Sequence, residues 1–427
     1  MRRGQMRVLM FGWEFPPYIS GGLGTACFGI TEGLSRLGTE IVFVLPRQKG
    51  NIHESHVRLI TANDVPLHEK SETDPFARAV TFRHVESDLI PYAGTGRART
   101  VVMGGISAAG KSSHGTWDLS DDYGSDMLLD AARYGRTAGI IAKEETFDVI
   151  HGHDWMTVHA GLEARRFSGR PYIYHVHALE FDRSGENINR RVYEIERQGL
   201  ESADHVISVS HYTKNMIIER YGINPEKITV VHNAVSRNEV CKRARGGKTT
   251  DHKTVLFLGR ITFQKGPDYF IEAAARVLEK VPSAVFVMAG SGDMMPRMVE
   301  RVARMKMGRQ FHFTGFIKGE EVERIYAMSD LYVMPSVSEP FGITPLEAML
   351  FDVPVIISKQ SGVSEILNHA LKVDFWDVNE LSNKIIAVLT YPALVKEMTD
   401  RSREEIAKIQ WNAAAEKIVS VYRRICG

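Results

Sequence analysis

The sequence contains two loops in which paired glycines or paired cations suit an anionic ligand. One, "FGWEFPPYISGGLGTA", carries Gly21 and Gly22 just ahead of a helical pattern. Glycine lets the backbone approach a ligand closely, and the start of a helix directs partial positive charge at the same place. The other, "GRITFQKG", carries Arg260 and Lys265, a combination that suits a diphosphate. The structural alternative for the glycines is a tight turn that needs a positive φ. The alternative for Arg260 and Lys265 is that both are solvated charges of a loop.

A third segment, "SEPFGITPLEAML", contains the glutamates Glu339 and Glu347. Thr344, Pro345 and Glu347 form a helix-start pattern, a capping box in which the glutamate caps the first turn. This pattern gives Glu347 a structural explanation. Glu339 precedes the predicted helix, where no cap needs it, so it is the more informative candidate for chemistry.

Histidines follow two predicted strands, in "HGHDW" and "HVHALEFD". His151, His153 and Asp154 suggest a metal site, but no suitably spaced histidine or cysteine completes one in the sequence. The pattern therefore favours packing and hydrogen bonding at strand ends. His177 differs, because it is expected just past the end of its strand, at the level of a ligand-binding cleft.

The stretch "GGISAAGKSS" matches the phosphate-binding pattern G-x-x-x-x-G-K-[ST] from Gly105 to Ser112. Such a loop needs a strand before it and a helix directly after it. The following "SHGTWDLSDDYGSD" does not start a helix. We therefore expect Lys111 to be a solvated loop lysine, and a nucleoside-triphosphate hydrolase acting through residues 105–112 is the disfavoured alternative.

Short apolar runs alternate with helical patterns in two successive halves of the chain, which predicts an α/β protein with doubly wound parallel sheets. Predicted strands in the first half are 7–11, 40–45, 147–151, 171–177, 205–210 and 228–233. Those in the second half are 254–259, 284–290, 311–315, 331–336 and 354–358. A polar segment, 236–253, separates the halves as a linker. Ligands of such sheets bind outside the carboxyl ends of the strands, which is where the loops above are expected.

Composition narrows the class of protein. A chain of 427 residues exceeds what one core serves, and a net charge of +1 gives no reason to expect nucleic acid. The three cysteines, Cys27, Cys241 and Cys426, lie far apart and fit a reducing compartment. The first apolar run is too short for a secretory signal, and no apolar window is long enough for a membrane span. We expect a cytoplasmic protein.

Taken together, the loops resemble those of the retaining glycosyltransferases that include glycogen and sucrose-phosphate synthases, a family 4-like group. The segments "GGLG", "GRITFQKG", "SEPFGITPLEAM" and "PVIISKQSGVSEIL" carry the resemblance. It covers nearly the whole chain except residues 50–124. It implies GT-B architecture, in which two Rossmann-like domains face each other across a cleft. The domains it implies are an acceptor domain (1–236, with an irregular insertion at about 50–124), a donor domain (254–408) and a last helix (409–427) that returns to the first domain.

The resemblance also implies a nucleotide-sugar donor, ADP-glucose or UDP-glucose, a glucan or other sugar acceptor, and no cofactor or metal. Arg260 and Lys265 would bind the diphosphate, and Glu347 would hold the ribose. Glu339 would contact the hydroxyls of the transferred sugar, and His177 would contact the sugar near the reaction centre. Further positions implied are Gly21, Gly22, Phe341, Gly342 and Ile343 for the donor, and Asp154 and Trp155 on the acceptor side.

Short glycogen and starch synthases are the members that the sequence resembles most, through "MRVLMFGWEFPPYISGGLG" and "HGHDW". Two departures leave the acceptor open. The lysine of the Lys-x-Gly-Gly motif that glycogen synthases usually carry is replaced by Ile19, and Glu347 is a second glutamate that bacterial glycogen synthases tend to lack. Transfer to a small acceptor, as in trehalose or sucrose-phosphate synthesis, is therefore the alternative.

Overall fold

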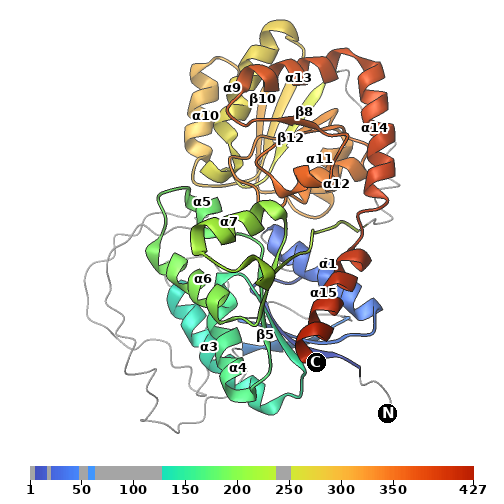
Figure 1. Cartoon of the computed structure of the whole chain (residues 1–427). Helices are drawn as coiled ribbons and strands as arrows, with labels where there is room; N and C mark the ends of the chain where they lie inside the picture. Colours follow the sequence, from blue (N-terminus) through green and yellow to red (C-terminus); the bar gives the residue numbers. More distant parts are fainter. Residues whose placement is uncertain (1–4, 17–20, 48–55, 63–126, 237–251) are drawn as a thin grey trace, which may run out of the picture.

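The computed structural model shows two parallel β-sheets, each covered by helices on both faces (Figure 1). It describes residues 5–16, 21–47, 56–62, 127–236 and 252–427. The loop 105–112, with its phosphate-binding pattern and Lys111, lies outside these residues. Ile19 and Cys241 also lie outside them. Among the described residues, no helix is long and apolar enough to cross a membrane.

The first sheet has the order β3-β2-β1-β4-β5-β6-β7, and all neighbours are parallel. Its strands are β1 (Arg7–Phe11), β2 (Glu40–Leu45), β3 (Arg58–Thr61), β4 (Val149–His153), β5 (Tyr172–Val176), β6 (His205–Ser208) and β7 (Ile228–Val230). The strands read as continuous apolar runs because both faces are buried. The strand order changes direction between β1 and β4, and the carboxyl ends of these two strands therefore border the crevice where such sheets bind ligands.

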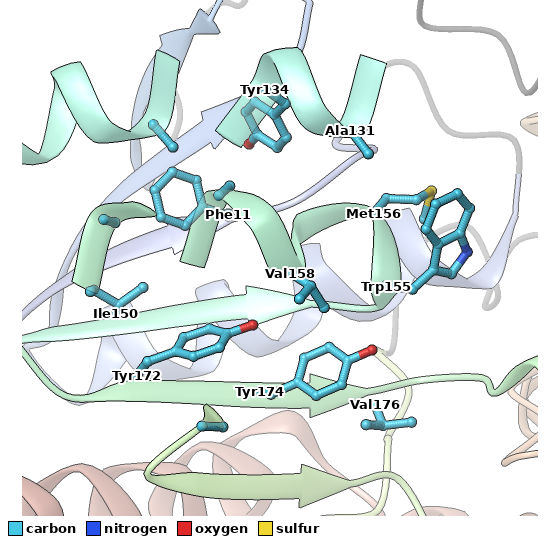
Figure 2. Packing of buried hydrophobic residues seen from close by; sticks show 14 of the residues in the cluster. Phe11, Ala131, Tyr134, Ile150, Trp155, Met156, Val158, Tyr172, Tyr174 and Val176 are labelled. Carbon is cyan, nitrogen blue, oxygen red and sulfur yellow. The ribbon is translucent and has the colours of Figure 1, made fainter. Parts of the chain in front are cut away.

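Alternate residues of these strands face two different helical layers. Helices α3 (Met127–Glu144), α4 (Val158–Ser168) and α6 (Arg190–Ser202) cover one face, and Figure 2 shows Phe11, Ile150 and Tyr134 packed in that core. Helices α1 (Gly22–Arg36) and α15 (Trp411–Cys426) cover the other face and contact each other. A Cβ atom at Gly29 would lie 2.0 Å from the Trp411 ring, so α1 and α15 pack this closely only because glycine stands there.

The second sheet has the order β10-β9-β8-β11-β12-β13 and is also parallel. Its strands are β8 (Thr254–Leu258), β9 (Val285–Ala289), β10 (Phe311–Gly315), β11 (Leu331–Met334), β12 (Val355–Ser358) and β13 (Leu371–Val373). One face packs on α9 (Pro267–Lys280), α10 (Met295–Arg304) and α13 (Val378–Thr390), and the other on α11 (Glu320–Ala327) and α12 (Thr344–Leu350). The order reverses between β8 and β11. Helix α14 (Pro392–Ile406) leads the chain back towards α15 (Figure 1).

All eleven predicted strands are present, with ends that shift by up to three residues. Gly38 has φ 81° just beyond α1, a conformation that favours glycine at the end of a helix. Two edge strands were missed. β3 falls in the segment interpreted as an irregular insertion, and the three-residue β13 is too short to give an apolar pattern of its own.

Candidate active site

A largely buried ion pair lies at the point where the strand order of the second sheet reverses. Lys265, in the loop after β8, donates from Nζ to Oε2 of Glu339, in the loop after β11, at 2.6 Å. The hydroxyl of Ser336 donates to the same carboxylate oxygen at 3.1 Å. Glu339 is only 6% exposed. The structure therefore joins directly two residues that the sequence analysis assigned to different parts of a ligand.

The loop that carries Lys265 is held tightly against the end of β11. Gly266, which follows it, has φ 66°, and a Cβ atom there would lie 2.1 Å from the carbonyl oxygen of Pro335. The backbone carbonyl of Gln264 accepts a hydrogen bond from the amide of Val337 at 2.9 Å. Arg260 lies in the same loop, and its guanidinium is 3.4 Å from the Gln264 side chain. Both predicted diphosphate cations therefore belong to one well-supported loop.

The backbone of Glu339 is fixed by the loop that follows β12. Its amide donates to the carbonyl of Gln360 at 3.0 Å, and its carbonyl accepts from Gly362 at 2.9 Å. The carbonyl of Phe341 accepts from Val363 at 2.7 Å. The "SGVSE" segment thus positions the loop that carries Glu339, although only the resemblance singled that segment out in the sequence.

The predicted capping box at the start of α12 is wrong. The residue before the helix, Ile343, has helical backbone angles, and no side chain caps the helix. Thr344 accepts a hydrogen bond from the hydroxyl of Tyr332 at 2.7 Å, and Glu347 accepts one from the hydroxyl of Tyr326 at 3.0 Å. Two buried tyrosines therefore engage the side chains that would have formed the cap. Burial raises the pKa of Glu347, and the hydrogen bond from Tyr326 opposes this rise.

Gly21 and Gly22 lie at the start of α1. Gly21 is extended, with φ −168°, so the alternative explanation of a turn with positive φ is wrong for it. A Cβ atom at either glycine would meet nothing within 4 Å among the described residues. Packing within the described part of the chain therefore does not require glycine at these positions, and approach to a ligand remains as their predicted role.

Asp154 orients the loop that carries His177. Its Oδ1 accepts hydrogen bonds from the amide of His177 at 2.6 Å and from that of Ala178 at 3.2 Å. Asp154 has φ 59°, uncommon for a residue other than glycine. Burial raises its pKa to about 6. Its neighbour Trp155, expected on the acceptor side, is 3% exposed and packs in the core beside Met156 (Figure 2).

Four histidines form a ladder across the ends of β4 and β5. Nδ1 of His153 lies 2.9 Å from Nε2 of His177, and Nε2 of His151 lies 3.1 Å from Nδ1 of His175. Nδ1 of His151 also lies 2.6 Å from the hydroxyl of Tyr422 on α15. Burial lowers the pKa of His151 and of His177 to about 3 and that of His153 and His175 well below the usual value, so the imidazoles are neutral near pH 7.

The two domains meet at the loop that carries Glu339. The hydroxyl of Ser338 donates to Oδ1 of Asp182 at 2.5 Å and lies 3.0 Å from the hydroxyl of Tyr212. Asp182 is part of α5 (Glu180–Ser184), close enough that the charge of Glu339 acts on it. Sequence reasoning missed Asp182, although it is the last residue of the quoted segment "HVHALEFD".

A second contact between the domains centres on Glu365. Its carboxylate accepts hydrogen bonds from the amides of His211 at 2.9 Å and Tyr212 at 2.6 Å, at the start of α7 (His211–Tyr221). It also pairs with Nε2 of His232 at 2.8 Å. A carboxylate at a helix start is favoured by the unpaired amides and the helix dipole. Partial burial alone would raise the pKa of Glu365, but these three hydrogen bonds lower it.

Comparison with known proteins finds similarity to glycosyltransferases in both halves of the chain. Residues 123–239 match the model described as Glycosyltransferase Family 4, and residues 241–405 match that described as Glycosyl transferases group 1. An uncharacterised glycosyltransferase of Methanocaldococcus jannaschii is 27% identical over 98% of both chains. The glycogen synthase of Mycobacterium tuberculosis is 26% identical over 98% of this chain and 94% of its own.

Among solved structures, the sucrose-phosphate synthase of Thermosynechococcus elongatus has a TM-score of 0.72 and 19% identity, over 98% of this chain and 99% of its own. This likeness concerns the fold. The two adjoining family matches divide the chain at the same place as the two parallel sheets, near residue 240. The chain therefore has the GT-B fold, and its second half is similar to the glycosyl transferases of group 1.

Proposed function

We propose that this enzyme transfers glucose from a nucleotide sugar, UDP-glucose or ADP-glucose, to a glucan acceptor and retains the anomeric configuration. The observation that carries the proposal is the buried pair of Lys265 and Glu339 at the reversal point between β8 and β11. A cation and a carboxylate at this point suit the two ends of a donor, its diphosphate and its sugar. Arg260, in the same loop as Lys265, adds a second cation.

Transfer breaks the bond between the anomeric carbon and the diphosphate oxygen and forms a bond to an acceptor hydroxyl. Negative charge grows on the leaving diphosphate, and preorganised cations stabilise such charge best in a closed site. We assign this role to Lys265 and Arg260. The acceptor attacks on the face from which the diphosphate departs, and the leaving phosphate oxygen takes the acceptor proton.

Glu339 accepts hydrogen bonds from hydroxyls of the transferred sugar in this scheme. One of its oxygens, Oε2, is already engaged by Lys265 and Ser336, which leaves Oε1 for the sugar. The carboxylate also stabilises positive character on the sugar in the transition state. His177, whose imidazole is neutral because burial lowers its pKa, contacts the same sugar from the other domain.

The remaining contacts with the donor are those that the resemblance to the glycosyltransferase family implies. Glu347 offers Oε1 to the ribose while Oε2 holds Tyr326. Phe341, Gly342 and Ile343 precede Glu347 in the same segment and offer backbone groups to the donor, and Gly342 has φ 99°, which favours glycine. The amides of Gly21 and Gly22, at the start of α1, approach the distal phosphate. The scheme uses no metal ion and no cofactor.

Fewer residues point to the identity of the acceptor than to that of the donor. Asp154 holds the loop of His177 and so borders the acceptor side, whereas the buried Trp155 serves the core. Similarity along nearly the whole chain to a glycogen synthase favours a glucan. A small sugar or sugar phosphate is the second candidate, because Ile19 replaces the lysine usual in glycogen synthases.

Turnover assays with both nucleotide sugars test the proposal. We expect transfer to glycogen with retained configuration, detected by NMR, and unchanged in excess chelator. Glu339→Gln should lower turnover about 10²-fold or more with little change in nucleoside diphosphate affinity, because it removes charge needed in the transition state. Glu404→Gln, at an exposed position, is the matched control. Near-normal turnover of Glu339→Gln on the true acceptor would refute the assignment.

A further inference from the structure

We propose that Cys27, His153 and His177 bind a thiophilic divalent metal ion, best matched by Zn²⁺. We propose further that this ion blocks the part of the active site that contacts the transferred sugar. One ligand atom of each residue lies within 4.8 Å of the other two. The three residues come from α1, from the end of β4 and from the loop after β5. One thiolate and two imidazoles form a donor set typical of Zn²⁺.

A buried nitrogen without a partner supports the site independently. Nε2 of His153 has no hydrogen-bond partner among the described residues, and the residue is 0% exposed. Its other nitrogen, Nδ1, faces His177, so no choice of tautomer gives Nε2 a partner. Buried polar atoms are normally satisfied, and an unsatisfied one needs an explanation. A metal ion bound at Nε2 would provide it, and His177 would give up its hydrogen bond with Nδ1 of His153 to bind the same ion.

The surrounding charges favour a cation. The carboxylates of Asp154 and Glu14 both act on the thiol of Cys27, and both residues are buried. A divalent ion would replace the thiol proton, which passes to solvent, and would offset these two negative charges. Three protein ligands leave the fourth position of a tetrahedral Zn²⁺ for water.

A second histidine set is less suitable. His151, His153 and His175 also lie close enough to share an ion. However, both nitrogens of His151 are already engaged, by Tyr422 and by His175. All three of these histidines are fully buried, whereas His177 is partly exposed and gives an ion a route in. The set that includes Cys27 is therefore the one we propose.

The expected consequence of binding is inhibition, and this part rests on the proposed function. There His177 contacts the transferred sugar, and a ring nitrogen bound to a metal ion cannot hydrogen-bond a hydroxyl. The ion would also tie α1 to the loop that carries His177. Metal binding itself does not depend on the proposed function and is measured separately.

Binding is tested with Co²⁺, whose absorption reports tetrahedral geometry and thiolate ligation, and with Zn²⁺ as competitor. The protein is a full-length variant, Cys241→Ala with Cys426→Ala, which keeps Cys27 as the remaining cysteine. We expect one ion per chain with a thiolate-to-cobalt band. Adding Cys27→Ala should remove the band and weaken binding at least about 100-fold. Absence of the band from the protein that retains Cys27 overturns the site without requiring that the Cys27→Ala protein folds.

Inhibition is tested by turnover of metal-free protein with increasing Zn²⁺. We expect the protein that retains Cys27 to lose activity at the stoichiometry of binding and to regain it with chelator, and the Cys27→Ala protein to resist Zn²⁺. Binding with unchanged turnover would refute the inhibitory role. Lack of any turnover in metal-free wild type would instead count against the proposed function, while the cobalt spectrum would still decide on the site.

Discussion

At the scale of single residues, the pair of Lys265 and Glu339 dominates the candidate site. Their side chains are 19% and 8% exposed. Removing one partner of a buried pair leaves an uncompensated charge, whereas replacing both can be neutral. In the free enzyme each residue therefore stabilises the other, and both are in place before a donor arrives.

A double-mutant cycle separates this mutual stabilisation from catalysis. Lys265→Met, which keeps the length of the side chain, should lower the free energy of unfolding by about 3 kcal/mol because Glu339 loses its cationic partner. Combining it with Glu339→Gln should restore most of the stability but none of the turnover. Chemical denaturation and turnover of the two single variants and the double variant check this. Additive stability losses in the double variant would show that the pair does not act as a unit.

At the scale of elements, the positions of the reactive side chains depend on how strand-end loops are braced. The loop after β8 turns at Gly266 directly under the carbonyl of Pro335, at the end of β11. This turn brings Lys265 from one strand end to Glu339 from the other. The close contact, as well as the positive φ, requires glycine.

Two glycines with nearly the same φ separate these causes. Gly266 has φ 66° and Gly169, after α4, has φ 67°, but a Cβ atom at Gly169 would meet nothing within 4 Å among the described residues. Gly169→Ala should cost about 1–2 kcal/mol of stability, from backbone strain alone, and leave turnover unchanged. Gly266→Ala should cost clearly more and should reduce turnover by displacing Lys265. Equal losses of stability in the two variants would contradict the steric argument.

At the scale of the whole molecule, the relation between the domains depends on contacts around α7 and the loops that carry Glu339 and Glu365. Glu365 holds the start of α7, and Ser338 contacts Asp182. These contacts join the half that contains His177 to the half that contains the ion pair. They would therefore help to assemble the site from residues of both domains.

Glu365→Gln tests this joint. Loss of the charge should weaken the contact with α7, and small-angle scattering should show a larger radius of gyration. Glu405→Gln, which alters an acceptor of amides within one domain, should not change it.

Because the pKa of Glu365 is lowered from 4.5, its contribution to stability is present above pH 4.5 and is lost as pH falls through its folded pKa. The stability difference between wild type and Glu365→Gln should therefore shrink under acid conditions. A constant difference would contradict the assignment.

The sequence by itself determined the order and type of the main elements and the loops in which chemistry is expected. Apolar periodicity, glycines and helix starts are local signals, and the strands of both sheets except the edge strands β3 and β13 follow from them. The positions of Arg260, Lys265 and Glu339 after strands were also readable, because parallel sheets bind ligands at the carboxyl ends of their strands. The capping box at Thr344 failed because buried tyrosines from distant segments competed for the same side chains.

Only the tertiary structure decided which of these residues touch. Lys265 meets Glu339, Asp182 meets Ser338, and Cys27 lies beside His153, although each pair is far apart in the chain. The sequence showed no suitably spaced histidine or cysteine beside these histidines, and the fold brings Cys27 of α1 near them across the reversal point between β1 and β4. Periodicity reports which face of an element is buried, but contacts between elements depend on strand order and helix packing, which local sequence does not encode.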